Sequence, residues 1–258
     1  MNNSSIIHDN AKLGNNVKIG PFCFIGENVT IKDNCVLHSH VVVDGNTTVM
    51  ENSEIFPFAS IGTTPQDLKY KGEKTRIVIG KNCKIREYVT VNLGTEGGGG
   101  ITSVGDNCLL MIGTHVAHDC FIDDNVIFAN HSTLAGHVIV EKNVVVGALS
   151  AIHQFSRIGE GSMIGGMSGI TSDVIPFTTV MGNRAKLSGL NLVGLKRNNF
   201  KKNEINELRR IFKYLFYSNE KTLEYRLNKI REENQNYYTI TKILKFLESE
   251  TRRSFCMP

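Results

Sequence analysis

The chain has 258 residues. It lacks any apolar run of about 18 residues or more, the length that a transmembrane helix requires. Its first ten residues, MNNSSIIHDN, contain neither the basic segment nor the apolar segment of a secretory signal. Its six cysteines include no CxxC motif. We therefore expect a cytoplasmic globular protein with reduced thiols and no stable membrane insertion.

Basic residues are scarce in the first part of the chain and abundant in the last. Residues 184–258 contain 17 of the 29 Lys and Arg residues but only 8 of the 25 acidic residues, which gives this part a net charge of +9. Residues 1–183 carry −5. The basic tail is either a solvated helical surface or a binding surface for an acidic protein, an anionic substrate or nucleic acid.

A period of six organises most of the sequence. From Ile7 to Ile61 the first residue of every hexad is aliphatic, and the fifth residue of every complete hexad is small. The pattern resumes at Ile79 and again, shifted by one residue, at Val104, with Phe128 as its one non-aliphatic first residue. Three hexads make one triangular coil, and stacked coils bury the large residues and pair as parallel strands. The period therefore predicts a mainly β fold, a parallel β-helix.

The same register assigns the cysteines, the loops and the tail. Five of the six cysteines fall at the small fifth position, which predicts core residues and not ligands. Two stretches, 63–78 and 92–103, interrupt the hexads and are expected to be loops that leave a corner. From about Asn199 the apolar residues follow helical spacing in three segments. We expect a β-helical domain over 1–190 and a small α-helical domain over 191–258.

Four histidines gather in one part of this register. His118, His137 and His153 belong to hexads that follow one another at intervals of one coil, so we expect them on one outer face, with His115 near the corner that leads onto it. Such a group could hold zinc, as in the γ-class carbonic anhydrases of the same fold. It could instead supply a general base, with Asp119 orienting an imidazole. No nucleophilic Ser or Cys stands out beside the group, which favours direct transfer to a bound acceptor. Gly136 follows His118 by one coil, and its backbone N–H suits an oxyanion.

Specific motifs add a family resemblance. The chain contains IGPFCFIG, LHSHVVVDG, QDLKYKGE, LLMIGTHVAHDC, LAGHV, HQF and GNRAKLSGLNLVGLKR, followed by the helical tail. With these it resembles, over essentially its whole length, the UDP-N-acetylglucosamine O-acyltransferases that begin lipid A synthesis. The resemblance implies a left-handed coil and a homotrimer with sites between the prisms. It also implies transfer of an R-3-hydroxyacyl chain from acyl carrier protein to the 3-hydroxyl of the sugar, without metal or cofactor.

The resemblance also implies roles for individual residues. His118 would be the general base, Asp119 would steady its imidazole, and the Gly136 N–H would stabilise the oxyanion. The residues implied to bind substrate or nucleotide are Gln66, Asp67, Lys69, His115, His137, His153, Gln154, Asn191 and Arg197. Both UDP-N-acetylglucosamine and its 3-amino analogue fit as acceptors. The acidic carrier protein gives the basic tail a partner, and no nucleic acid is expected.

Gly166 is implied to set the length of the acyl chain. It follows His118 by two and two-thirds coils, or roughly 13 Å along the axis at the usual strand spacing. By resemblance a glycine there leaves room for a chain of about 14 carbons, since each buried methylene adds to the binding. The sequence departs from the family pattern at three positions, which are Ala148 for Gly, Arg184 for His and Asn198 for Arg.

Two rival assignments differ in what the sequence should contain. The N-acyltransferase that acts later in lipid A synthesis has an additional uridine-binding domain at its N-terminus, and hexads that begin at Ile7 leave no room for it. A β-helix with a purely structural role would not explain four clustered histidines beside an interrupting loop such as PQDLKYKGE.

Overall fold

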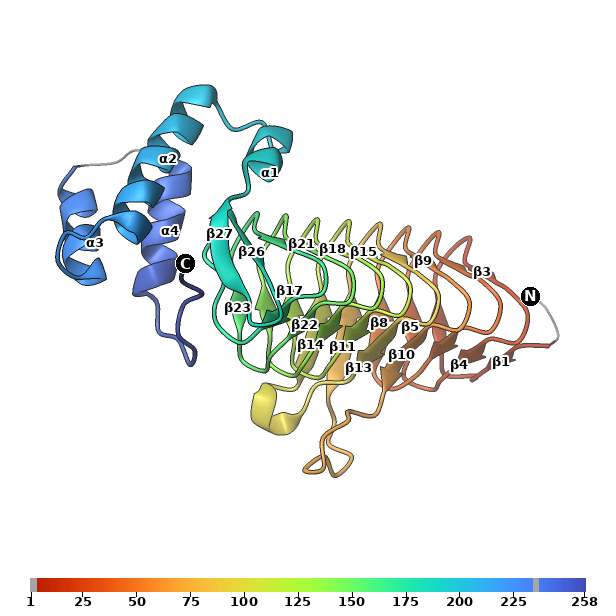
Figure 1. Ribbon diagram of the computed structural model, residues 1–258. Coiled ribbons are helices and arrows are strands. Elements are labelled where there is room, and N and C mark those ends of the chain that lie inside the picture. Colours follow the sequence, from red (N-terminus) through yellow and green to blue (C-terminus); the bar gives the residue numbers. More distant parts are fainter. Residues whose placement is uncertain (1–3, 234–236) are drawn as a thin grey trace.

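The computed structural model describes residues 4–233 and 237–258, which form a triangular prism of stacked coils followed by a group of helices (Figure 1). Each regular coil contributes one short strand to each of three sheets, which we call faces A, B and C. Neighbouring coils pair in parallel. The fold is a left-handed parallel β-helix with a helical C-terminal part, so the predicted fold class is confirmed.

Successive strands along the chain belong to faces A, B and C in turn. Face A contains β1 (Ile6–Ile7), β4 (Phe24–Ile25), β7 (Val42–Val43), β10 (Ser60–Thr63), β13 (Thr90–Asn92), β16 (His115–Val116), β19 (Thr133–Leu134), β22 (Ala151–Ile152) and β25 (Gly169–Ile170). Face B contains β2 (Lys12–Leu13), β5 (Thr30–Ile31), β8 (Thr47–Val49), β11 (Arg76–Ile79), β14 (Ile101–Val104), β17 (Phe121–Ile122), β20 (Ile139–Val140) and β23 (Arg157–Ile158). Face C contains β3 (Lys18–Ile19), β6 (Val36–Leu37), β9 (Glu54–Ile55), β12 (Lys84–Ile85), β15 (Leu109–Leu110), β18 (Ile127–Phe128), β21 (Val145–Val146), β24 (Met163–Ile164), β26 (Thr178–Met181) and β27 (Lys186–Leu190).

The hexad pattern explains this arrangement. The aliphatic first residue of each hexad is the inward residue of a strand, and from Ile25 onward these side chains are buried. Complete burial of one such side chain stabilises the fold by about 1.5–3 kcal/mol. The five cysteines of the hexads lie beside them in the core, and all six cysteines of the chain are free and buried.

The corners of the prism require a left-handed backbone conformation. Residues at the fourth hexad position repeatedly have φ near +60°. Asparagine tolerates this region better than most residues because its short side chain can bond locally. Along the edge between faces B and C, the BC edge, these positions are occupied by Asn16, Asn34, Asn52, Asn82, Asn107, Asn125 and Asn143.

Both insertions leave the prism at the edge between faces A and B, the AB edge. One joins β10 to β11 and the other joins β13 to β14, where it contains the short 3-10 helix Glu96–Gly98. Each loop is shorter than the interruption in the hexads because the flanking strands are longer than the ordinary strands of the prism. Ile77 and Ile79 of β11, for example, are both buried. Two consecutive coils therefore carry loops on the same edge (Figure 1). The next coil contains β16 and β17, and His118 lies between these two strands.

The C-terminal part contains α1 (Leu192–Arg197), α2 (Lys202–Tyr217), α3 (Leu223–Glu232) and α4 (Tyr238–Glu248). Helices α2 to α4 correspond to the three expected segments. The short α1 and the antiparallel pair β26 and β27 were not expected, since neither carries a long periodic pattern. Within residues 4–233 and 237–258, each helix is too short or too polar to cross a bilayer.

Phe128 tests the packing of the prism, because it is the one aromatic first residue and is 0% exposed. We expect Phe128→Ala to lower the free energy of unfolding by roughly 3–5 kcal/mol, the scale for a large core side chain replaced by alanine. The measurement is the shift of the denaturant midpoint. Phe121→Ala is the control, because Phe121 is 52% exposed. Equal shifts for the two variants would contradict this account of the core.

Candidate active site

The candidate site follows the AB edge over three consecutive coils. Its corners contain His118 and Asp119, then Gly136 and His137, then Gln154 and Phe155. Asp119, His137 and Phe155 follow one another at intervals of one coil and all have φ near +60°. The expectation that the histidines share a face was therefore wrong in detail. His118 and His137 lie in the corners themselves, while His115 lies on strand β16 and His153 follows strand β22.

A buried carboxylate holds the imidazole of His118. Nδ1 of His118 lies 2.8 Å from Oδ2 of Asp119. The backbone N–H of Thr95 donates to Oδ1 of Asp119 at 2.8 Å, and the Thr95 hydroxyl donates to Oδ2 at 2.6 Å. An ionised carboxylate accepts hydrogen bonds, so Nδ1 of His118 donates and Nε2 carries the free lone pair. The arrangement gives His118 a fixed ring and one basic nitrogen.

Two glycines allow other groups to approach this pair closely. A Cβ added at Gly136 would lie 2.6 Å from Nε2 of His118, so a side chain there would displace the ring. A Cβ added at Gly98, in the second loop, would overlap the carboxylate of Asp119. The glycine-rich loop therefore covers the carboxylate with backbone, and the missing side chain of Gly136 leaves room for the His118 ring.

His137 lies against His118 and is neutral at neutral pH. The two rings meet edge to face with centroids 5.0 Å apart, and Nε2 of His137 lies 3.8 Å from Oδ2 of Asp119. On its other side His137 stacks on Phe155 at 4.5 Å. Burial lowers the pKa of His137, and the charges of His118 and Arg252 act in the same direction, while Asp119 opposes them. Because the pKa falls, the neutral form of His137 predominates at pH 7.

The zinc alternative has a candidate ligand set in the same place. Among the described residues, His118, Asp119 and His137 bring one possible ligand atom each to within 4.8 Å of one another. Both oxygens of Asp119 already accept short hydrogen bonds, and Nδ1 of His118 is one of the donors. Ligation would need separations from a metal of about 2.0–2.2 Å and loss of these bonds. The geometry favours a hydrogen-bonded base over a metal centre.

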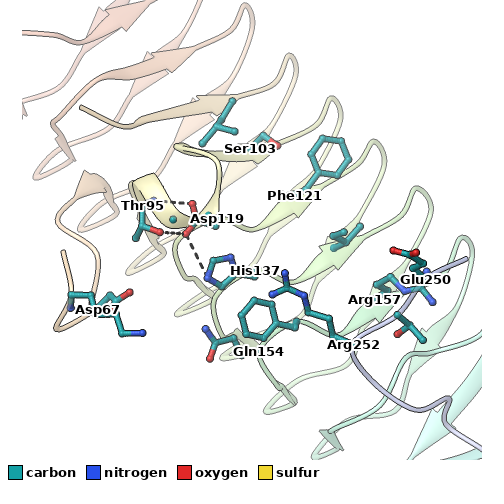
Figure 2. Close-up of a pocket in the computed structure, with 17 residues that line it drawn as sticks. Asp67, Thr95, Ser103, Asp119, Phe121, His137, Gln154, Arg157, Glu250 and Arg252 are labelled. Carbon is teal, nitrogen blue, oxygen red and sulfur yellow. Dashed lines mark hydrogen bonds and ion pairs between the residues drawn. The ribbon is translucent and has the colours of Figure 1, made fainter. Parts of the chain in front are cut away.

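A cleft of about 820 Å³ opens beside these corners (Figure 2). The first loop lines it with Asp67 and Lys69, across from His137 and Gln154. Oδ1 of Asp67 accepts a hydrogen bond from the backbone N–H of Lys69, which fixes the turn of this loop. Gln66 is exposed in the same loop and does not line the cleft.

Other sequence-predicted residues are engaged elsewhere. Nδ1 of His115 lies 2.7 Å from the Thr90 hydroxyl, and burial lowers the pKa of His115. Nδ1 of His153 accepts a hydrogen bond from Arg253 at 2.7 Å. Asn191 caps helix α1, accepting from the Gly194 N–H and donating to the carbonyl of Gly161.

Of the predicted site residues, Asp67, Lys69, Asp119, His137 and Gln154 line this cleft, and the others, including His118 and Gly136, do not. Two of the others lie on different parts of the chain. Arg197 is exposed at the end of α1. Gly166 lies in a corner between strands β24 and β25, on the edge between faces C and A, the CA edge. The whole of face A separates it from His118. The separation of these two residues, two and two-thirds coils, is not a whole number of coils and so places them on different edges. The role of Gly166 in chain length stays a prediction.

Sequence reasoning missed three residues of the site, which are Thr95, Phe155 and Arg252. Thr95 lies in the interruption NLGTEGGGG, whose glycines mark a close approach of backbone to another group. Phe155 occupies the same corner position as Asp119 and His137, so the period of the coil could have identified it. Arg252 comes from the last turn of chain beyond α4, and no local pattern places it beside the prism.

Comparison with known proteins agrees with the fold and the site. Residues 10–45 and 101–136 match the bacterial transferase hexapeptide family, and residues 173–256 match the second domain of UDP-N-acetylglucosamine O-acyltransferase. A relative from Aliarcobacter butzleri, named acyl-[acyl-carrier-protein]–UDP-N-acetylglucosamine O-acyltransferase, is 53% identical over 84% of each chain. A relative of the same name from Paracoccus denitrificans is 48% identical over 79% of this chain and 77% of its own.

Solved structures extend the likeness to the whole chain. The UDP-N-acetylglucosamine acyltransferase from Campylobacter jejuni superimposes with a TM-score of 0.94 at 40% identity, covering 100% of this chain and 99% of that one. The match therefore includes both the prism and the helices that follow it. On this similarity the chain belongs to the family of the acyl-[acyl-carrier-protein]–UDP-N-acetylglucosamine O-acyltransferases.

Proposed function

We propose that this acyltransferase moves an R-3-hydroxyacyl chain from acyl carrier protein to the 3-hydroxyl of UDP-N-acetylglucosamine, the first step of lipid A synthesis. The observation that carries the proposal is the imidazole of His118, which is held by a buried carboxylate beside a large cleft. The family membership supports the same donor and acceptor.

The chemistry follows from the two nitrogens of His118. Nε2 takes the proton from the sugar hydroxyl while that oxygen attacks the thioester carbonyl, and Nδ1–H stays bound to Asp119. The Gly136 N–H stabilises the oxyanion of the tetrahedral intermediate. When the carbon–sulfur bond breaks, the imidazolium returns the proton to the leaving thiolate. No metal or cofactor is required for any of these steps.

The side chains around the cleft support direct transfer. The Thr95 hydroxyl donates to Asp119 and is not free to act as a nucleophile. Ser103 lines the cleft, but no histidine of the described chain is hydrogen-bonded to it. An activated hydroxyl needs an adjacent base, so a covalent acyl-enzyme has no support here.

We also propose a homotrimer in which the site lies between two prisms. Three predicted substrate-binding residues lie away from the cleft of their own chain, namely Gly166, Asn191 and Arg197. In the proposed trimer, a neighbouring copy would contribute these residues to the cleft. The CA edge carries exposed apolar side chains, including a stack of Phe58 on Tyr88 at 5.1 Å. Exposed apolar patches of this kind mark surfaces that associate.

The start of helix α2 is the proposed docking surface for the acidic carrier protein. Lys201 and Lys202 are exposed there, and no acidic side chain of the described residues pairs with either. Arg210, which the basic tail also contains, pairs with Glu207 and Glu233, so its charge is largely compensated. Six free thiols fit the reducing cytoplasm, where this carrier and the sugar nucleotide would be available.

The direct test is an acyl-transfer assay with the purified protein, R-3-hydroxyacyl carrier protein and UDP-N-acetylglucosamine. The variant His118→Ala tests the identity of the base. We expect the wild type to form the 3-O-acyl product, and the variant to lose roughly 10²–10⁴-fold in kcat, the scale for a lost general base. His8→Ala is the control, because His8 is an exposed histidine on the first coil. A variant at His118 with near-normal kcat would contradict the assignment.

Gly166→Met tests the proposed control of chain length. Gly166 does not have a positive φ, and an added Cβ would lie 3.3 Å from the carbonyl oxygen of Ala148, a tight contact with backbone that needs a shift of a few tenths of an ångström. We expect the preference to shift toward shorter acyl chains, by about 0.8 kcal/mol for each methylene excluded. Competition between long-chain and short-chain carriers measures the shift, and sedimentation of the same sample measures the trimer. The control is Ser39→Met, at the same corner position near the N-terminal end of the prism. It should leave the preference between long-chain and short-chain carriers unchanged.

The docking surface is tested by Lys201→Glu combined with Lys202→Glu. Reversal of two unpaired charges should raise KM for the acidic carrier and leave KM for the sugar nucleotide nearly unchanged, with a weaker effect at high salt. The control combines Lys18→Glu and Lys32→Glu, which changes the net charge equally on exposed residues of the N-terminal coils. If both double variants raise the carrier KM alike, the effect is one of net charge and the surface is elsewhere.

A further inference from the structure

The end of the chain forms a strap that returns from helix α4 to the prism (Figure 1). We call residues 249–258 the C-terminal strap. Phe255 forms a parallel bridge with Asp173, and the backbone of Asp173 bonds to Ser254 and Cys256, each at 2.8 Å. The strap thereby lies beside the final coil, close to the AB edge.

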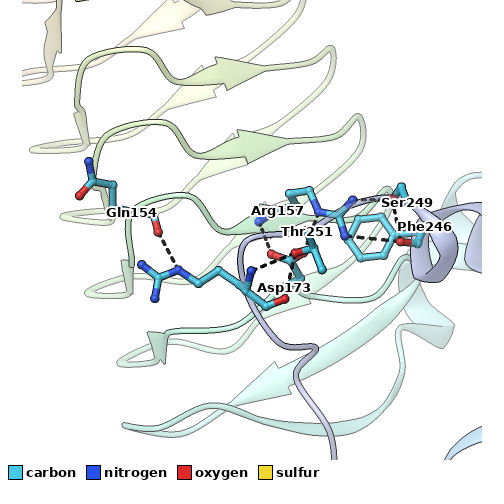
Figure 3. A network of polar contacts seen from close by, with 7 residues as sticks. Gln154, Arg157, Asp173, Phe246, Ser249 and Thr251 are labelled. Carbon is cyan, nitrogen blue, oxygen red and sulfur yellow. Dashed lines mark hydrogen bonds and ion pairs between the residues drawn. The ribbon is translucent and has the colours of Figure 1, made fainter. Parts of the chain in front are cut away.

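A buried ion pair fixes one end of the strap (Figure 3). Nε of Arg157 lies 2.7 Å from Oδ2 of Asp173, and the Thr251 hydroxyl donates to the same oxygen at 2.5 Å. Arg157 also donates to the Ser249 hydroxyl at 2.5 Å. The ion pair is screened from water because the Asp173 side chain is 0% exposed. The strap is therefore held just before Arg252.

The residue after Arg252 is held as well. Nε of Arg253 donates to the carbonyl of Gln154 at 3.0 Å, and its Nη2 donates to His153 at 2.7 Å. The Thr251 hydroxyl accepts from the Arg253 N–H at 3.0 Å, which closes a local turn around Arg252. Both neighbours of Arg252 thus bind the protein, and their contacts set the position of the side chain between them.

Arg252 itself points into the cleft with its donors unused. Its guanidinium carbon lies 4.7 Å from the centre of the Phe155 ring, and Phe155 stacks on His137. Figure 2 places the side chain beside His137, on the opposite side of the cleft from Asp67. Among the described residues no acceptor bonds to Arg252, and Glu250, which also lines the cleft, forms no ion pair with it.

An arginine with free donors, stacked on an aromatic ring in a cleft, has the geometry that binds phosphate oxygens in pairs. The charge of Arg252 also acts on His137. Burial lowers the pKa of His137 most, and the nearby positive charge of Arg252 lowers it further. Both proposed substrates carry phosphate. The sugar nucleotide has a diphosphate, and the carrier protein presents its acyl chain on phosphopantetheine.

We propose that Arg252 of the C-terminal strap is an anion-binding residue of the cleft that holds a phosphate of one of the two substrates. The assignment rests on the proposed function for the identity of the substrates. Arg252 acts in binding, not in proton transfer. The strap makes this possible because it delivers to the middle of the site a residue that lies close to the C-terminal end of the sequence.

The experiment measures equilibrium binding by the full-length protein, with UDP and 4′-phosphopantetheine as probes and with uridine and pantetheine as their counterparts without phosphate. Arg252→Met keeps most of the side chain and removes the charge. We expect it to weaken binding of at least one phosphorylated probe by about tenfold or more, the scale for a charge-assisted hydrogen bond, and to leave its counterpart unchanged. Arg252→Lys should retain part of the affinity.

Arg209→Met is the matched control, because Arg209 is exposed on helix α2 and bonds only to Asn206 within the described chain. If Arg252→Met loses affinity for UDP alone, the phosphate belongs to the nucleotide. If it loses affinity for phosphopantetheine alone, the phosphate belongs to the carrier. Unchanged binding of both phosphorylated probes, or equal loss with and without phosphate, overturns the proposal. The proposed function is judged by turnover of the wild type, so its failure is distinguishable from failure at Arg252.

Discussion

The constant length of the coil, three hexads, is the constraint on which the rest of the molecule depends. Regular coils have the same length, so their backbone groups pair and each residue lies above the one that precedes it by three hexads. This places Asp119, His137 and Phe155 in one column and His118, Gly136 and Gln154 in another. The site is thus assembled from three short corners that are far apart in local sequence but adjacent along the axis.

The two lengthened coils both carry their extra residues at the AB edge, where the candidate site lies. The two loops replace consecutive corners of the AB edge. Strands β11 and β14 keep their register beside them, whereas the pairing of β10 with β13 shifts by one residue between Ile61 and Thr63. The second loop brings the Thr95 donors and the backbone of Gly98 onto Asp119, a carboxylate that would otherwise face water. A buried carboxylate whose oxygens are matched by donors holds its partner in one orientation. The insertion that interrupts the repeat is therefore what completes the dyad.

Most of the fold was predictable because the hexads report both burial and corner conformation. The pairing of His118 with Asp119 was also accessible, since the two are adjacent and the register places them in one corner. Positions that depend on contacts across long separations were not accessible. The bond between Arg253 and His153 joins residues 100 positions apart, and the packing of Arg252 on Phe155 depends on the path of the whole helical part. The change of edge between His118 and Gly166 follows from the coil count alone, whereas the path of an acyl chain between them does not.

The end of the prism that the strap covers has a consequence for solubility. A stack of parallel strands exposes unpaired backbone groups at its last coil, and these can accept another chain. Here the hairpin β26 and β27 closes face C, and the segment around Gly182 and Ala185 bonds to Gly169 on face A. Ser254 and Cys256 of the strap bond to Asp173 beside face B. Head-to-tail polymerisation requires an open strand edge on both contacting ends. Closure of this one end is sufficient to prevent the solenoid from growing into fibres, even though the first coil has no comparable cover among the described residues.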